Sequence, residues 1–381
     1  MRLGDCLKMN LHSYSEKDKW SVIRYLDTGN ITEGRLNEVQ SLLVGRDKIP
    51  SRARRKVSIG DIVFSTVRPN QKHYGIIEEE IENLLVSTGF AVMTVNEEIA
   101  DPYFIYYFLT QPDIINSLQA IAEQSTSTYP SIKPSDIEGI EICLPALKTQ
   151  KKVSNILRVI DEKMKLNNRI NDNLQQQAMA LYAEMFLNSS NNDVTSGTLS
   201  DIAVITMGQS PSGSSYNEDG VGEVFYQGRA EFGFRFPKRR LFTTEPKRMA
   251  EDGDVLLSVR APVGDLNVAY ERCCIGRGLG AIHSKTGHSS FVLYTMFALR
   301  SQLDVFNGEG TVFGSINRDA LNAIPIDVPL VTQIDRFETV AHPIDELIRA
   351  NYEENCRLEA IRDSLLPKLM SGEIDVSAVQ L

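Results

Sequence analysis

The segment LPALKTQKKVSNILRVIDEKMKLNNRIN at residues 144–171 has a second copy in the same chain, VPLVTQIDRFETVAHPIDELIRANYEEN at residues 328–355. Ile160-Asp161-Glu162 in the first copy and Ile344-Asp345-Glu346 in the second lie 184 residues apart. Repetition at a fixed separation is the sequence signature of a duplicated structural unit. The organisation of the whole chain can be worked out from this repeat.

The repeat continues upstream of these segments. Ser131-Ile132 and Ser315-Ile316 are again 184 residues apart, whereas Gly60-Asp61-Ile62-Val63 and its counterpart Gly253-Asp254-Val255-Leu256 are separated by 193. A changing separation indicates insertions and deletions in loops, which tolerate them better than strands or helices do. The chain is therefore predicted to contain two diverged copies of one unit.

Each copy is predicted to combine strands with helices. Short β-rich runs, 59–67 in the first copy and 255–259 in the second, are separated by Gly, Pro and Asn. A strand that ends in proline follows at 140–145 and at 324–329, because apolar residues alternate there with period two. A long helical segment comes after that strand in each copy. The predicted fold class is therefore α+β.

Both long segments carry one seam with alternating steps of four and three residues, the heptad spacing of helices that pack along their length. The seam runs through Ile160, Met164, Asn167 and Leu174 in the first copy and Ile344, Ile348, Asn351 and Leu358 in the second. A buried asparagine in such a seam can fix the register of two helices, but these asparagines could equally be exposed where the seam frays. Arg362 places a charge in the second seam, and Pro343 predicts a kink or a new helix start.

The resulting order is a mixed domain, a long helix, a linker, a second mixed domain and a second long helix. We place the domain boundaries at 1–148, 149–187, 188–330 and 331–381. The polar run 188–193 has the composition of a linker.

The composition is that of a globular protein outside the membrane. The 381 residues are 42% hydrophobic and 24% charged, and they show neither a membrane-spanning run nor a secretory signal. Five cysteines without a CxxC pair fit a reducing compartment, so we expect a cytoplasmic location and no zinc site. The net charge of −10 argues only weakly against a nucleic-acid ligand, because phosphate binding depends on local potential.

Two stretches are strongly basic despite this acidic balance. Residues 46–72 contain eight Lys or Arg against two Asp, and residues 229–248 contain seven against two Glu. Such clusters suit DNA phosphates, and arginine can also bridge guanine O6 and N7, although charge runs often form solvated loops. Because one cluster precedes the Gly-Asp strand in each copy, we predict that both contact DNA. The predicted contacts are Arg52, Arg54, Arg55, Lys56, Arg68, Lys72, Arg229, Lys238, Arg239, Arg240 and Arg260.

No catalytic residue, metal ligand or cofactor site is predicted. The sequence has no GxxxxGK[ST] loop and no Asn-Pro-Pro-aromatic motif of an adenine methyltransferase. Gly276-Arg277-Gly278-Leu279-Gly280 lacks the strand–GxGxxG–helix context and predicts a tight turn beside a strand, with Arg277 as a weaker candidate for DNA contact. Asp161-Glu162-Lys163 resembles a set of nuclease carboxylates, but on a heptad helix a solvated face explains it better.

The layout resembles the specificity subunits of type I restriction–modification systems over essentially the whole chain. The segment 144–171 is similar to the family's central spacer, and 358–374 is similar to its C-terminal signature. Gly208-Gln209-Ser210-Pro211-Ser212 and Tyr226-Gln227-Gly228 are similar to motifs of its target-recognition domains, and 25–31 lies in a similar place in the first copy.

The resemblance implies two pseudo-twofold-related target-recognition domains, each reading one half of a split, asymmetric double-stranded DNA site. Two long antiparallel helices would join these domains and dock two adenine methyltransferase subunits, which carry the S-adenosylmethionine. Restriction subunits would add translocation and cleavage where present, and the chain itself would be no enzyme. A duplicated protein–protein scaffold that binds no DNA is the alternative, supported by the acidic net charge. A stand-alone nuclease would need a carboxylate set that the sequence does not offer.

Overall fold

The computed structural model describes residues 1–125, 129–188, 194–308 and 314–379. It divides into two compact units: unit 1 comprises Met1–Met164 and Cys356–Leu381, and unit 2 comprises Lys165–Asn355. Each long helix therefore contributes one end to each unit. The predicted linker lies, apart from Asn188, outside the described residues.

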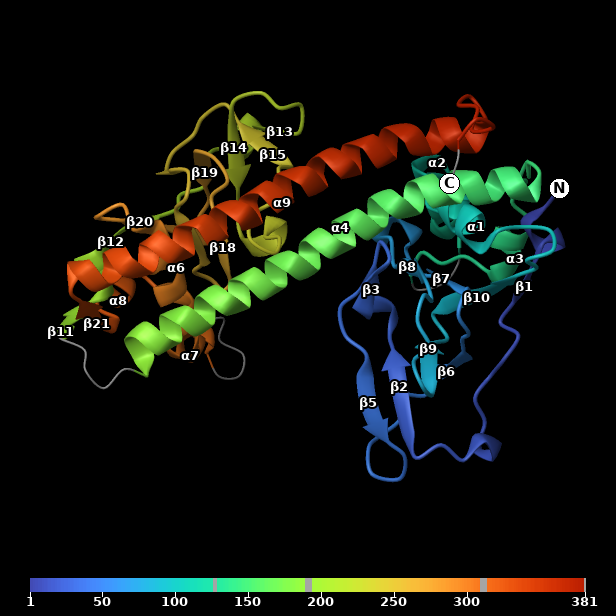
Figure 1. The fold of residues 1–381 in the computed structure, drawn as a ribbon, viewed down its shortest axis with the longest axis horizontal. Helices are drawn as coiled ribbons and strands as arrows, with labels where there is room; N and C mark the ends of the chain where they lie inside the picture. Colours follow the sequence, from blue (N-terminus) through green and yellow to red (C-terminus); the bar gives the residue numbers. More distant parts are fainter. Residues whose placement is uncertain (126–128, 189–193, 309–313, 380–381) are drawn as a thin grey trace. The chain divides into compact units, whose positions relative to one another are not determined.

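Unit 1 contains two four-stranded sheets. The first is antiparallel with the order β1-β10-β7-β8, and the second has the order β5-β2-β9-β6 with β2 and β9 parallel (Figure 1). The strands are β1 Leu7–Met9, β2 Val22–Leu26, β5 Gln40–Leu43, β6 Ala53–Lys56, β7 Ile62–Ser65, β8 Tyr74–Ile76, β9 Leu84–Ser87 and β10 Phe90–Val95, with a small hairpin of β3 Ile31–Thr32 and β4 Arg35–Leu36. The short helices are α1 Pro102–Leu109, α2 Pro112–Glu123 and α3 Pro134–Glu138.

Unit 2 repeats this topology. The sheet β12-β20-β17-β18 corresponds to the first sheet of unit 1, and β13-β15-β14-β19-β16 corresponds to the second, again with one parallel pair, β14 and β19. The strands are β12 Ala203–Met207, β13 Tyr216–Asn217, β14 Glu223–Tyr226, β15 Leu241–Thr243, β16 Met249–Ala250, β17 Val255–Ser258, β18 Leu266–Val268, β19 Cys273–Ile275 and β20 Leu279–Ser284. The short helices are α5 Leu199–Ile202, α6 Ser289–Ala298, α7 Arg300–Asp304 and α8 Arg318–Asn322. The duplication predicted from the sequence is confirmed.

The strand after each Gly-Asp pair lies at the centre of its sheet and is buried on both faces. All four residues of β7 and all four of β17 are buried, which explains why these runs are continuously apolar instead of alternating. The aspartates themselves fix the turn that starts the strand. Asp61 accepts a hydrogen bond from the backbone N–H of Ser58 at 2.7 Å, and Asp254 accepts one from Glu251 at 2.8 Å.

The two long helices are α4 Leu147–Tyr182, which ends in a π-helical turn at Ala183–Leu187, and α9 Val331–Ser371. They close the core of each unit. In unit 1, Leu157 of α4 and Leu366 of α9 belong to the same core as β7 and β10. In unit 2, Tyr182 and Phe337 pack edge to face with ring centroids 5.6 Å apart. The hydrophobic core of each unit is therefore complete only when the long helices pack against its sheets.

The helices are antiparallel within unit 2, and asparagines connect them. Asn167 donates to the side-chain oxygen of Asn355 at 2.9 Å, and Asn351 donates to that of Asn171 at 2.8 Å. Asn167 and Asn171 are 1% and 3% exposed, so these bonds lie inside the seam. Of the two interpretations left open by the sequence, the structure supports the one in which the asparagines fix register. The other predicted seam residues are buried or half-buried.

Two sequence predictions are corrected here. Pro343 does not start a new helix, because α9 is continuous across it; the residue is on the exposed face, where the carbonyl that loses its N–H partner can turn to water. The closing strand forms only in the second copy, as β21 Pro325–Pro329 paired with β11 Val194–Thr198. In the first copy a single bridge joins Arg2 and Glu141, because Leu3 already begins a 3-10 turn.

Replacing Asn351 by Ala should destabilise the protein by about 1–3 kcal/mol, because the oxygen of buried Asn171 would lose its donor. The measurement is the urea midpoint followed by circular dichroism. Asn173→Ala on the exposed face of α4 is the control and should change the midpoint little. The double variant N171L/N351L removes both partners and should recover stability. Equal midpoints for Asn351→Ala and the control would contradict a register role.

Candidate nucleic-acid interface

The first basic cluster lies on and just before β6, and its members differ in availability. β6 pairs with β9 through a register shift between Ala53 and Arg55, a β-bulge. Arg52 and Arg54 are exposed, and no carboxylate of the described chain lies in ion-pair distance of either. Arg54 contacts only the backbone oxygen of Ser51, with its Nε at 3.4 Å. These two arginines present their charge to solvent.

Arg55 and Lys56 are half-buried and hold the loop before β2 instead. Arg55 donates to the side-chain oxygen of Asn10, and burial lowers the pKa of its guanidinium. Lys56 pairs with Asp18 at 2.5 Å, and its ammonium lies 5.1 Å from the ring centroid of Trp20. A DNA phosphate would have to displace these partners.

Further along unit 1, Arg68 and Lys72 flank the loop between β7 and β8. Arg68 is exposed and adopts a left-handed backbone conformation with φ of 48°, and its guanidinium lies 5.3 Å from the ring centroid of Tyr129. Lys72 pairs with Glu33 at 2.6 Å. Arg68 is therefore the more available of the two.

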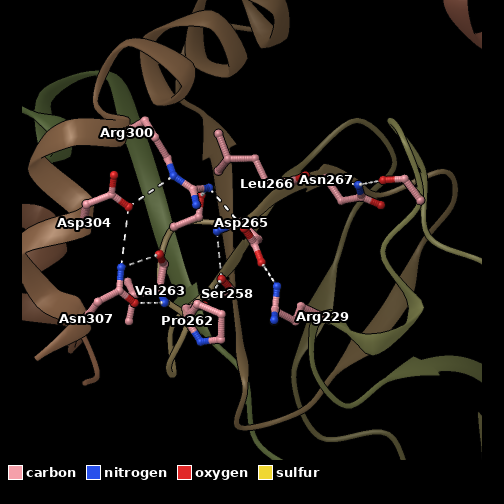
Figure 2. Close-up of polar contacts among 12 residues, drawn as sticks. Arg229, Ser258, Pro262, Val263, Asp265, Leu266, Asn267, Arg300, Asp304 and Asn307 are labelled. Carbon is pink, nitrogen blue, oxygen red and sulfur yellow. Dashed lines mark hydrogen bonds and ion pairs between the residues drawn. The ribbon is translucent and has the colours of Figure 1, made fainter. Parts of the chain in front are cut away.

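Most of the second basic cluster is neutralised by carboxylates that lie elsewhere in the sequence. Arg229 pairs with Asp265, which also binds Arg300, and Figure 2 shows both arginines meeting this carboxylate. Arg239 pairs with Glu271. Exposed pairs of this kind contribute only about 0–1 kcal/mol, so a phosphate can replace the carboxylate.

Arg240 and Lys238 illustrate the two extremes of this cluster. Arg240 bonds Glu231 at 2.7 Å and Glu218 at 3.2 Å, and the hydrogen bond to Glu231 raises the pKa of its guanidinium. Lys238 is exposed, and none of the described carboxylates forms an ion pair with it. The linear count of basic residues therefore overstates the positive potential of this stretch.

The two clusters are also not equivalent in the fold. The first is centred on β6, whose counterpart in unit 2 is β16. Most of the second cluster lies between β14 and β15, which corresponds to the segment between β2 and β5 of unit 1. The apparent recurrence of the clusters before each Gly-Asp strand is thus a similarity of sequence order and does not reflect equivalent positions.

Arg235, which contributes to the basic count, is buried and serves the structure. It is 4% exposed and donates to Asp345 at 2.6 Å and to Gln175 at 3.0 Å. Burial lowers the pKa of this guanidinium, but Asp345 and Tyr294 outweigh that effect and raise it overall. Through this one side chain, the segment between β14 and β15 is fastened to both long helices.

The repeated Ile-Asp-Glu motif makes the same contact in both units. Asp161 accepts a hydrogen bond from Tyr107 of α1 at 2.6 Å, and Asp345 accepts one from Tyr294 of α6 at 2.9 Å. Each aspartate also binds an arginine: Arg235 in unit 2 and, at 3.2 Å in unit 1, Arg362.

Two sequence-based interpretations change as a result. Asp161 is not part of a solvated face, because its side chain is only 21% exposed and is engaged by Tyr107 and Arg362. Arg362 departs from the apolar seam because it reaches across to this carboxylate. The repetition of Ile-Asp-Glu was itself the signal that each copy makes an equivalent contact. The tyrosine partners, however, cannot be identified from the sequence.

Arg260 and the glycine-rich turn belong to a different part of unit 2. Residues 276–278 form the tight turn between β19 and β20, as predicted. The Ser258 hydroxyl accepts from the N–H of Asp265 and donates to the carbonyl of Pro262, which fixes the loop that carries Arg260 (Figure 2). Arg260 itself is exposed and forms a backbone bridge with Ser315.

Replacing Arg235 by Met should lower the stability of unit 2 by roughly 3 kcal/mol, because Asp345 would lose its charged partner in a largely buried place. Chemical denaturation measures the effect. Arg272→Met is the matched control, because Arg272 is exposed and pairs with two surface glutamates. The double variant R235M/D345L should regain much of the loss. Similar small losses for Arg235→Met and Arg272→Met would contradict a buried anchor.

Comparison with known proteins agrees with the repeated fold. A family model described as type I restriction modification DNA specificity domain matches residues 11–176. The putative type I restriction enzyme MjaX specificity subunit of Methanocaldococcus jannaschii is 30% identical over 345 residues, which cover 85% of this chain and 80% of the relative. The type I restriction enzyme HindI specificity subunit of Haemophilus influenzae is 27% identical over 185 residues, 49% of this chain and 40% of the relative.

Two solved structures are similar to this chain. The S subunit of a type I restriction–modification system from M. genitalium superimposes with a TM-score of 0.55 at 16% identity, covering 97% of this chain and 95% of that chain, so the two share a fold. The HsdS subunit from Thermoanaerobacter tengcongensis is 28% identical with a TM-score of 0.41, covering 98% and 96%. Among the described residues, no helix is both long and apolar enough to cross a membrane.

Proposed function

Since the chain belongs to the family of DNA-specificity subunits of type I restriction–modification systems, we propose that each of its units reads one half of a split, asymmetric double-stranded DNA site. A duplicated unit supports a two-part site, because each copy has its own pair of sheets and its own exposed basic side chains. The family relationship supports this proposal over the alternative of a scaffold that binds no DNA, which the acidic net charge favoured.

The observation that carries this proposal is the set of exposed arginine and lysine side chains without carboxylate partners among the described residues, in a chain of net charge −10. In unit 1, Arg52 and Arg54 are exposed, with no ion pair to any described residue. In unit 2, Lys238 and Arg260 are likewise exposed and form no ion pair with any described residue. Uncompensated cations on an acidic protein create local positive potential, which is the property that binds phosphates.

Protein partners are the second part of the proposal. Val340 and Leu347 of α9 are one heptad apart and 51% and 47% exposed, so this helix has exposed apolar residues outside its seam. Exposed apolar residues along a helix support a protein interface. We propose that the outer faces of the long helices, α9 among them, dock two DNA adenine methyltransferase subunits. Restriction or translocase subunits would be added where a system has them.

The chain itself is proposed to catalyse no reaction. Its sequence lacks a GxxxxGK[ST] phosphate loop and the Asn-Pro-Pro-aromatic motif that holds a flipped adenine, and the carboxylate of Asp161 is engaged by Tyr107 and Arg362. The methyltransferase subunits would then transfer the methyl group, and this chain would select the DNA sequence.

The test is to co-express the chain with type I methyltransferase subunits and to map methylated adenines across the host genome. We expect co-purification and methylation at one bipartite sequence. Replacing residues 1–146, which end just before α4, by the equivalent part of another family member should alter one half-site and leave the other unchanged. Methylation without any sequence preference, or alteration of both half-sites, would contradict the proposed division of labour.

Arg52→Ala/Arg54→Ala should weaken DNA binding by the same complex and flatten its salt dependence by up to ~0.9 log unit per lost phosphate contact. The measurement is the dissociation constant for a duplex as a function of KCl concentration. Arg272→Ala serves as the control, because the two glutamates already offset its charge. An unchanged slope in the double variant would return Arg52 and Arg54 to the class of solvated loop residues.

A further inference from the structure

A pocket of about 700 Å³ lies in unit 2, and three arginines line it. Arg260 comes from the loop after β17, Arg277 from the turn between β19 and β20, and Arg318 from the start of α8. Ser315 and Asn317 add polar groups, and apolar residues such as Val259 supply the rest of the lining. The three arginines thus come from three separate segments of the chain.

The turn that carries Arg277 is held rigidly by close contacts between backbones. A Cβ atom at Gly208 would lie 2.1 Å from the carbonyl oxygen of Gly276, and one at Gly278 would lie 2.8 Å from that of Gln227. No side chain fits in these places, so three glycine-containing motifs meet there. The Arg277 N–H donates to the hydroxyl of Ser210 at 3.2 Å. The other two residues of the turn are glycines, so Arg277 alone carries a side chain there, and this side chain is exposed.

The other two arginines are placed just as firmly. The N–H of Ala261 donates to Gly314 at 3.0 Å, and that of Ile316 donates to Val259 at 3.0 Å, so the segment before α8 is strapped to the end of β17. Asn317 caps α8 by accepting from the N–H of Ala320 at 2.9 Å, which places Arg318 at the first helical position.

The arginines of the pocket differ from most of the other described arginines of unit 2. Arg229, Arg239 and Arg240 all pair with carboxylates, and so do Arg272 and Arg300. None of the described residues that line the pocket is acidic, and no ion pair to a described carboxylate involves its three arginines. The three arginines carry like charges with no counter-ion among the described residues that line the pocket, so an anionic ligand would offset their charge.

Unit 1 has a basic residue one position after the counterpart of Arg260. Val67, after β7, bridges Ser131 as Arg260, after β17, bridges Ser315, and Arg68 follows immediately. Arg68 is exposed and lies over the ring of Tyr129. A cation at the exit of the central strand is therefore common to both copies, which the two long basic clusters are not.

We propose that the pocket lined by Arg260, Arg277 and Arg318 binds the phosphodiester backbone of DNA beside the half-site that unit 2 reads. The inference rests on the proposed DNA-reading function and names the part of the ligand that this surface takes. A concave, arginine-lined pocket matches a strand of phosphates, which project outward from a duplex, better than base edges inside a groove. Phosphate contacts position the protein on DNA without reading sequence.

The experiment uses the complex with methyltransferase subunits and two duplexes of equal length, one with the methylated site and one unrelated. The triple variant R260A/R277A/R318A should bind both more weakly by the same factor, with the salt slope reduced by up to ~0.9 per lost contact. The triple lysine variant R260K/R277K/R318K keeps the charges and should keep most of the slope. The methylated sequence should stay the same in both variants.

Two results would overturn the proposal. One is a salt slope unchanged by the triple alanine variant, which would leave the arginines without a phosphate. The other is a changed base preference at one half-site, which would make them base readers. Because all three arginines are exposed, the urea midpoint should stay close to that of the wild type, and the lysine variant controls for folding. A wild-type complex that methylates no bipartite site would refute the proposed function instead, while the unrelated duplex would still test the pocket.

Discussion

A hydrogen bond between a tyrosine of the globular part and an aspartate of a long helix recurs in both units, as Tyr107 with Asp161 and Tyr294 with Asp345. A carboxylate removed from water is costly unless it is hydrogen-bonded and paired, so each aspartate constrains what must lie around it. Burial and Asp161 raise the pKa of Tyr107, which keeps that phenol a hydrogen-bond donor. The short helices α1 and α6 are thereby fixed to the helices that complete their cores.

The second partner of each aspartate, an arginine, shows how the copies have diverged. In unit 1 the arginine is Arg362, which comes from α9, whereas in unit 2 it is Arg235, which comes from the segment between β14 and β15. The equivalent carboxylate therefore ties one long helix to the other in unit 1, and the segment between β14 and β15 to a long helix in unit 2. Both copies have an aspartate that pairs with an arginine at this position, but the arginine comes from a different element in each copy.

Ion pairing separates structural arginines from available ones. Arg229 and Arg240 are exposed, but their charges are offset by Asp265 and Glu231. Arg52 and Arg260, within the described chain, have no such partner. An acidic protein can therefore still offer positively charged sites to DNA. Its carboxylates offset the charge of some basic side chains and lie away from others. The net charge of −10 therefore says little about the ligand.

The sequence by itself determined the duplication, the α+β class, the two long helices and their seam, because each of these depends on a period or a separation along the chain. It also suggested that Asn167 and Asn171 fix register, although burial was needed to decide. Only the tertiary structure decided which basic residues are free, because the carboxylates that neutralise Arg229 or Arg239 lie more than thirty residues away in the chain. The gathering of Arg277 and Arg318 beside Arg260 was hidden for the same reason: a pocket is made by contacts between segments, and no local pattern records them.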